Sequence, residues 1–364
     1  MSLTHTRLAA LREIMRQTGT SLTALAPGAH MHWVLGYHPH PDERATFLLV
    51  GQTAAVMVVP SVNAQDIGAR VALPLHVWTD EDGPAAALAQ ALEVVVPEGC
   101  AKVSLDETMR ADAALLLLDH LAAAERCFAT ETVGALRMLK DAGEFSALKA
   151  AALVADKAMQ AGFAALRPGV TERAVADAIR AGFAAQQTPS AFCLVASGPN
   201  GAFPHHSTGD RLLQRGDAVV IDIGGTTGGF PSDMTRMAVV GVAPEGYDEV
   251  HAIVERAVQA AMAAARPGVM AQAVDKAARD VIAAAGYGAY FVHRTGHGLG
   301  LEVHEPPYLT ATSQTILQEG MVFSIEPGIY IPGRFGIRLE EIVILRADGP
   351  EILSSLPRHA FAAP

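Results

Sequence analysis

Four carboxylates and one histidine have the residue types and positions of a metal site: Asp222, Asp233, His297, Glu326 and Glu340. Asp222 closes the apolar run of residues 219–223, and Glu326 directly follows the apolar residues 322–325. An isolated carboxylate in such surroundings carries a large desolvation cost unless it is paired or bound to a metal. Both acids therefore predict a cationic partner.

Turns and strand periodicity place the other two acids. Asp233 follows the turn-rich residues 228–232, which suit a hairpin. In the later strand pattern a period of two puts Arg338 and Glu340 on one face and Glu341 on the other. We therefore expect Glu340, and not Glu341, to point inward.

Three histidines fall within twelve positions, at His293, His297 and His304. The glycines on both sides of His297 allow the backbone to approach a ligand closely, although spacing alone does not tell which histidine binds metal. Four carboxylates and a neutral imidazole carry about four negative charges, which two divalent cations would cancel, and such oxygen-rich ligands suit Mn²⁺, Co²⁺ or Zn²⁺. Two ions roughly 3.5–4 Å apart could share carboxylates and a hydroxide.

A weak internal duplication predicts the elements that position these groups. The repeated segments are 167–170 with 266–269, and 216–222 with 320–326. The step from Arg167 to His205 equals the step from Arg266 to His304. Each half is therefore predicted as a helix, a histidine-bearing loop, a glycine turn and a strand with an acid. In the first half Thr171 can cap a helix that continues through Ala185.

The preceding part of the chain has a different pattern. Residues 47–50 and 54–59 are typical of buried strands and 85–92 of a helix, so a small α/β domain is expected. At 364 residues the chain is long for one hydrophobic core. We predict two domains, 1–128 and 129–364, because a charged, helix-prone segment begins near residue 135.

Composition excludes several classes of function. The net charge of −11 argues against binding to nucleic acid or anionic membranes. The sequence has no apolar run long enough for a membrane span, and its first sixteen residues lack a secretory signal, which predicts a cytoplasmic protein. Three widely spaced cysteines provide neither a disulfide framework nor a zinc-finger spacing.

Taken together, the five candidate ligands resemble those of the pita-bread metallopeptidases of the prolidase and aminopeptidase P family. The matching segments are Gly296–Gly300, Ile325–Gly328 and Gly336–Glu340. The resemblance implies an α+β fold with a duplicated pita-bread (creatinase/aminopeptidase-like) catalytic domain, preceded by a smaller α/β creatinase-type domain that caps substrate and makes dimer contacts. It covers the catalytic part throughout and the first domain loosely.

The resemblance also implies roles for the ligands. Asp222 and Asp233 would bind one ion and His297 the other, with Glu326 and Glu340 bridging and Asp233 bridging as well. Mn²⁺ is the metal chosen by resemblance. Glu326 would carry protons between the attacking water and the leaving proline nitrogen.

Other side chains receive supporting roles from the same comparison. His205, in preference to its neighbour His206, would contact substrate. His293 would lie at the proline pocket, and His304 would stabilise the tetrahedral intermediate. The remaining two supporting residues are Tyr330 and Arg338.

The expected reaction is hydrolysis of the Xaa-Pro bond, chiefly in dipeptides, by a hydroxide bridging two metals. Removal of one residue from longer peptides, as by aminopeptidase P, is the alternative. Three other members of the fold match less well. Methionine aminopeptidases generally lack a large first domain. Creatinase works without metal and non-catalytic pita-bread binding proteins typically lose ligands, whereas this sequence has the complete ligand set. A dipeptidase must bind a free carboxylate, for which Arg44 is the candidate cation, and the family implies a homodimer.

Overall fold

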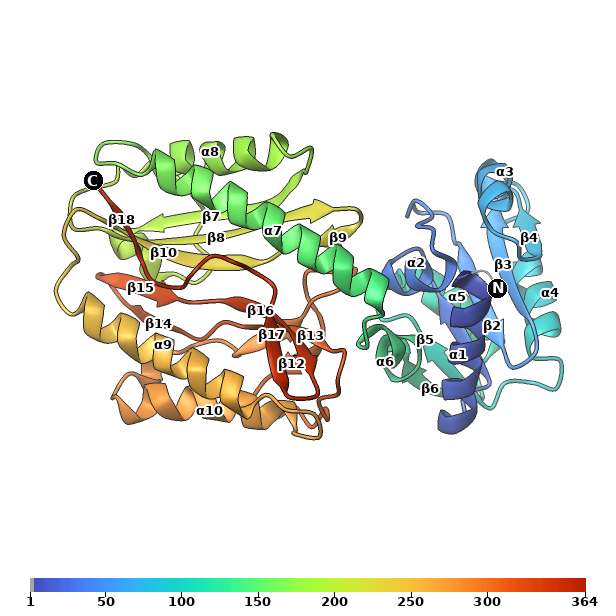
Figure 1. Cartoon of the computed structure of the whole chain (residues 1–364). Helices are drawn as coiled ribbons and strands as arrows, with labels where there is room; N and C mark the ends of the chain where they lie inside the picture. Colours follow the sequence, from blue (N-terminus) through green and yellow to red (C-terminus); the bar gives the residue numbers. More distant parts are fainter. Residues whose placement is uncertain (1–2) are drawn as a thin grey trace. The chain divides into compact units, whose positions relative to one another are not determined.

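The computed structural model describes residues 3–364 and divides the chain into two compact units, one up to Arg137 and one from Met138 onward (Figure 1). Met1 and Ser2, which begin the predicted first domain, lie outside the described residues. We call the two parts the N-terminal unit and the C-terminal unit.

The N-terminal unit is built on a six-stranded sheet of order β4-β3-β2-β1-β5-β6. Its strands are β1 (Leu22–Leu25), β2 (Phe47–Gly51), β3 (Ala55–Pro60), β4 (Leu75–Trp78), β5 (Lys102–Leu105) and β6 (Glu125–Phe128). Its main helices are α1 (Leu3–Thr18), α2 (Ala29–Leu35), α3 (Ser61–Arg70), α4 (Ala85–Val95) and α5 (Ala111–His120). Only β1–β2 and β2–β3 are antiparallel. The α/β prediction is confirmed, and β2, β3 and α4 occupy the predicted segments.

Residues 129–137 fold with the N-terminal unit, although the sequence-based boundary precedes them. They form η1 (Ala129–Glu131) and α6 (Val133–Arg137). Ala129 and Val133 are fully buried, and the hydroxyls of Ser104 and Thr132 are 2.8 Å apart. These contacts join the segment to the first sheet, so the structural division comes nine residues after the predicted one.

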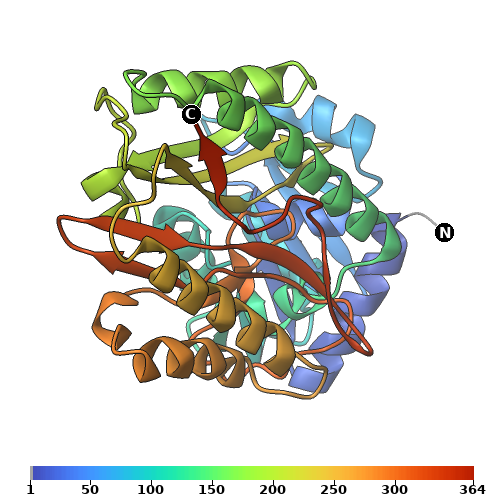
Figure 2. The same ribbon diagram turned by 60° about the vertical axis from the view of Figure 1, so that its left-hand side comes forward.

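The C-terminal unit has two helix pairs on the outer sides of its strands (Figures 1 and 2). One pair is α7 (Ala142–Ala165) and α8 (Glu172–Ala184), and the other is α9 (Tyr247–Ala264) and α10 (Ala271–Ala284). The first sheet has the order β18-β10-β8-β7, with β9 paired to β8. Its strands are β7 (Ser190–Ser197), β8 (Ala218–Thr227), β9 (Phe230–Pro231), β10 (Met234–Val240) and β18 (Phe361–Ala363).

The second sheet has the order β12-β11-β13-β16-β17, and a separate ribbon pairs β14 with β15. The strands are β11 (Gly296–Gly298), β12 (Glu305–Leu309), β13 (Val322–Ile325), β14 (Gly328–Ile331), β15 (Phe335–Arg338), β16 (Glu341–Arg346) and β17 (Gly349–Ile352). Two short turns of helix complete the unit, η2 (Gly198–Ala202) and η3 (Gly288–Tyr290).

The predicted duplication is visible in matching backbone contacts. Gly169 and Gly268 have φ angles of 84° and 88°, a region that favours glycine. Their N–H groups donate to the carbonyls of Leu213 and Leu317 respectively, each at 2.8 Å. Thr171 caps α8 by accepting the N–H of Ala174, as predicted. The two halves are therefore equivalent α/β units.

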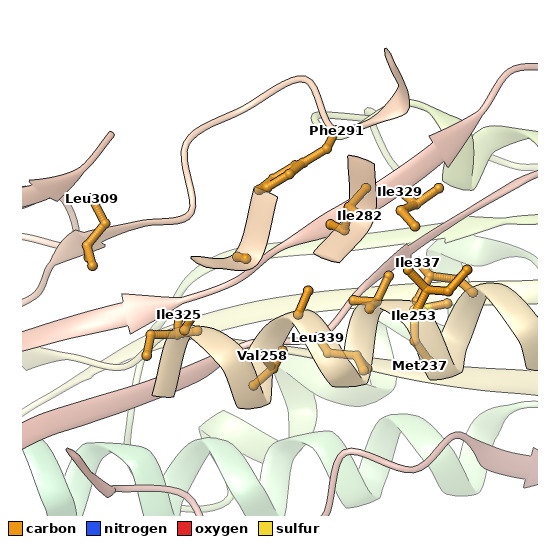
Figure 3. Packing of buried hydrophobic residues seen from close by; sticks show 14 of the residues in the cluster. Met237, Ile253, Val258, Ile282, Phe291, Leu309, Ile325, Ile329, Ile337 and Leu339 are labelled. Carbon is orange, nitrogen blue, oxygen red and sulfur yellow. The ribbon is translucent and has the colours of Figure 1, made fainter. Parts of the chain in front are cut away.

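A large apolar cluster fixes the strand ends of the second half (Figure 3). Ile325 and Leu339 are fully buried in it, facing α9. Burying a side chain of this size stabilises the fold by about 1.5–3 kcal/mol. Because neighbouring side chains point in opposite directions, burial of these two residues directs Glu326 and Glu340 away from the cluster.

No helix among residues 3–364 has the length and apolar character needed to cross a membrane.

Candidate metal centre

All five predicted ligands line one cavity of about 990 Å³ in the C-terminal unit. They come from β8, the β9–β10 connection, β11, the end of β13 and the β15–β16 connection. Potential ligand atoms lie within 4.8 Å of one another in three overlapping groups: Asp222, Asp233 and Glu340; His297, Glu326 and Glu340; and Asp233, His297 and His304. Residues more than a hundred positions apart in the sequence thus converge.

The first acid lies inside its strand. β8 continues to Thr227 because residues 224 and 225 still pair with β7. Asp222 also pairs across the sheet with Thr235 of β10, two residues after Asp233. The apolar run predicts Asp222 at the end of a strand. Because Asp222 instead pairs with strands on both sides, its backbone is held more firmly than at a strand end.

The acids crowd one another. Burial, followed by the charges of its neighbours, raises the pKa of Asp233 well above its ordinary value, and burial does the same for Glu340. The pKa of Asp222 is also raised by burial, although Arg338 opposes the shift. Burial opposes ionisation of Glu326 too, but the hydrogen bond and charge of His297 lower its pKa to about 2. Ionising all four acids therefore requires additional positive charge at this place.

His297 is oriented as a ligand. Its Nδ1–H donates to the carbonyl of Gly298 at 3.1 Å. With Nδ1 engaged in this bond, Nε2 faces Glu326 Oε1, 3.2 Å away, and Asp233 Oδ2, 3.5 Å away, where it can donate to them or bind a cation. A ring nitrogen that faces two carboxylates while its partner donates to a backbone carbonyl is a common arrangement at metal sites.

A chain of hydrogen bonds supports His293, the residue that the sequence predicts at the proline pocket. Arg338 donates from Nη2 to Asp222 Oδ2 at 2.5 Å and from Nη1 to the Tyr330 hydroxyl at 2.9 Å. The Tyr330 hydroxyl in turn donates to His293 Nε2 at 2.8 Å. Arg338 also donates from Nε to Thr235 Oγ1, and that hydroxyl donates to Glu340. The Asp222 side and the His293 side of the cavity are thereby connected.

The remaining histidines differ in their partners. His205 and His206 both line the cavity, but His206 Nε2 lies 3.0 Å from the fully buried carboxylate of Glu172. The ring of His304 packs against the ring of His297, with the ring centroids 4.1 Å apart. Burial and the charge of His297 lower the pKa of His304 to about 4. His205 and His304 therefore present imidazoles to the cavity.

Arg44 belongs to the N-terminal unit, where acids already bind it. Its Nε and Nη2 donate to the two carboxylate oxygens of Asp80 at 2.9 Å each, and its Nη1 donates to Glu43 at 2.8 Å. This bidentate pair occupies the edge of the guanidinium that a substrate carboxylate would use.

Two supporting contacts have no signal in the sequence. Lys140 and Glu305 form a 2.6 Å ion pair with side chains only 2% and 3% exposed, next to His304. The Thr235 hydroxyl accepts a hydrogen bond from Arg338 and donates one to Glu340. The alternation of side chains along the strand predicts only the face on which Thr235 lies, not these partners. Both join residues more than a hundred positions apart, which local patterns do not reveal.

The side chains present fit a divalent metal. Asp222 Oδ1 is buried and has no hydrogen-bond partner anywhere in residues 3–364. An unpaired buried oxygen beside further carboxylates and an oriented imidazole is costly without a cation and favourable with one.

Comparisons with known proteins agree with this geometry. Residues 146–347 match the model of metallopeptidase family M24, and residues 7–139 match the creatinase/prolidase N-terminal domain. The chain is 39% identical to a probable dipeptidase PepE of Mycobacterium tuberculosis, over 98% of this chain and 96% of that protein. It is also 39% identical to an Xaa-Pro dipeptidase of Pyrococcus furiosus, over 62% of this chain and 65% of that protein.

Solved structures are similar over the full length. Dipeptidase PepE from Mycobacterium ulcerans has a TM-score of 0.92 at 38% identity, covering 100% of this chain and 98% of that one. A prolidase from Thermococcus sibiricus has a TM-score of 0.90 at 32% identity, covering 100% and 99%.

Proposed function

Because this chain belongs to metallopeptidase family M24, we propose that it hydrolyses the Xaa-Pro bond of dipeptides at a centre of two divalent metal ions. The observation that carries the proposal is the convergence of four carboxylates and one oriented histidine in a single cavity. The names of the Pyrococcus and Thermococcus relatives support the Xaa-Pro dipeptide as substrate.

The proposed ligand assignment is the one that the family resemblance implies, and the closeness of the five side chains supports it. Asp222 and Asp233 would hold one ion and His297 the other, with Glu326, Glu340 and Asp233 as ligands that both ions would share. Mn²⁺ is the proposed metal, with Co²⁺ and Zn²⁺ as alternatives, since oxygen ligands dominate. When bound, the ions polarise the scissile carbonyl and lower the pKa of a water molecule.

Glu326 is the proposed proton carrier. Its Oε1 lies 3.2 Å from His297 Nε2 and accepts a hydrogen bond from Ser324 at 3.1 Å, so the carboxylate is held in place. His297 lowers the pKa of this carboxyl group, so the ionised form that can accept a proton from water is favoured. It then delivers that proton to the leaving proline nitrogen.

The histidines around the cavity bind and orient the substrate. A proline peptide bond is a tertiary amide without an N–H, so its pocket must fit the ring by shape. His293 is held for this purpose by Tyr330, while Phe192, Leu194 and Val303 supply apolar walls. His205 contacts the substrate, and His304 donates to the oxygen that becomes negatively charged.

The proposal extends to assembly and location. Two copies of the chain associate, the N-terminal unit capping the neighbour's cavity, and the protein acts in the cytoplasm. Light scattering of the purified chain tests the dimer by its mass.

Substrate length is tested with Ala-Pro and Ala-Pro-Ala, using protein reconstituted with Mn²⁺ and an EDTA-treated control. The proposal predicts metal-dependent release of proline from Ala-Pro and little consumption of Ala-Pro-Ala. Cleavage of the tripeptide to Ala and Pro-Ala at a comparable rate would instead assign aminopeptidase P. Activity on neither peptide would reject Xaa-Pro hydrolysis.

A further inference from the structure

Three arginines line the cavity, and two of them are already paired. Arg338 is bound to Asp222 and Tyr330 as described above. Arg180, on α8, forms a 2.8 Å ion pair with Asp177 one turn earlier on the same helix. All three nitrogens of the Arg338 guanidinium are engaged, and the Arg180 guanidinium is held toward Asp177 by its Nη1.

Arg294 differs from both. Its guanidinium makes no hydrogen bond or ion pair with any residue in the described part of the chain, and its guanidinium carbon lies 4.7 Å from the ring centre of Tyr308. The side chain is half-buried. Stacking on an aromatic ring restrains the planar group while leaving its N–H edge free to bind an anion.

The position of Arg294 relates it to the reacting groups. It directly follows His293, whose Nδ1–H donates to the Arg294 carbonyl at 2.7 Å. The positive charge of Arg294 also contributes to the lowered pKa of His304. Arg294 therefore lines the same cavity as His293 of the proposed proline pocket and His304, the proposed oxyanion residue.

The chemistry of a dipeptide substrate requires a cation at such a place. In an Xaa-Pro dipeptide the carboxylate is attached to the proline ring itself, so it must lie beside the ring pocket. It also enters a cavity lined by Asp222, Asp233, Glu326 and Glu340, where an unpaired anion is disfavoured. A guanidinium with a free edge compensates that charge and matches a carboxylate with two parallel hydrogen bonds.

Resting on the proposed Xaa-Pro hydrolysis, we propose that Arg294 binds the C-terminal carboxylate of the dipeptide and so selects dipeptides over longer chains. In a longer peptide the same position holds a neutral amide, which offers only one acceptor and no charge. This assignment replaces Arg44, whose guanidinium is bound by Asp80.

The test compares Ala-Pro with Ala-prolinamide, which lacks the negative charge but keeps the scissile bond. Wild-type protein should prefer the acid. In an Arg294→Gln variant the ratio of kcat/KM for acid over amide should fall about 10- to 100-fold, mainly through KM for the acid. Arg294→Lys should restore part of the ratio, since it returns the charge without the planar fork. Bound metal is measured in each variant.

Arg180→Gln is the matched control, because it removes another cavity arginine that is already paired, and it should leave the ratio within about twofold of wild type. An equal loss on acid and amide in Arg294→Gln would overturn the proposal, as would loss of the ratio in Arg44→Gln alone. If wild type cleaves Ala-prolinamide as well as Ala-Pro, carboxylate selection fails while Xaa-Pro hydrolysis stands. If it cleaves neither, the proposed function fails and the inference falls with it.

Discussion

A Glu326→Gln variant is expected to hydrolyse Ala-Pro about 10²–10⁴-fold more slowly than wild type while remaining folded. Glutamine keeps the size of the side chain but cannot take a proton from water or return it to the proline nitrogen. It also removes a negative charge that raises the pKa of Asp222, Asp233 and Glu340. The metal-free fold should therefore not be weakened. The measurement is kcat for proline release by the metal-loaded protein.

Metal content must be measured in the same sample, because Glu326 is also a proposed ligand. Glu319→Gln is the matched control, since Glu319 is exposed in the turn before β13 and should leave kcat unchanged. Wild-type turnover by a metal-loaded Glu326→Gln protein would contradict the proton-carrier role. A loss of turnover that only follows a loss of metal would restrict Glu326 to binding.

An Arg236→Met variant is expected to lower the free energy of unfolding by about 3–5 kcal/mol. Arg236 is completely buried on β10 and lies 3.1 Å from Glu341, whose side chain is 2% exposed. It also donates to the Leu356 carbonyl at 2.8 Å and to the backbone carbonyl of Glu340. Methionine fills most of the space but leaves Glu341, among residues 3–364, with Arg358 as its one remaining cation. Urea denaturation of the metal-free protein measures the change.

Arg346→Met is the control for this prediction. Arg346 pairs with Glu351 at 2.8 Å, but both side chains are more than a third exposed. Solvent screening makes such a pair worth less than about 1 kcal/mol. Equal effects of the two variants would show that burial does not govern the Arg236 pair.

The cluster of candidate metal ligands was predictable because most of its acids break a local pattern. Asp222 interrupts an apolar run and Glu326 ends one, and a carboxylate in such a place requires a partner. The alternation of side chains along a strand puts Glu340 and Glu341 on opposite faces. The structure gives a reason for that separation, because Glu341 points to Arg236 while Glu340 faces the cavity. The duplication was predictable from repeated glycine turns, since their positive φ angles constrain the residue type.

Other features depend on contacts that a one-dimensional pattern does not contain. Nothing near Lys140 in the sequence indicates its burial against Glu305. The same applies to the pairing of Arg44 with Asp80, which engages a residue that the sequence presents as a free loop cation. The division between the two units lies after the predicted boundary for a similar reason. Ala129 and Val133 are buried by tertiary contacts, and no local sequence pattern indicates that burial.

The most direct test of the whole account is a titration of metal-free protein with Mn²⁺ in which bound metal and proline release from Ala-Pro are measured together. The account predicts no release without metal, saturation at two ions per chain, and loss of the second ion in a His297→Ala variant. Full activity in protein shown to contain no metal would contradict it.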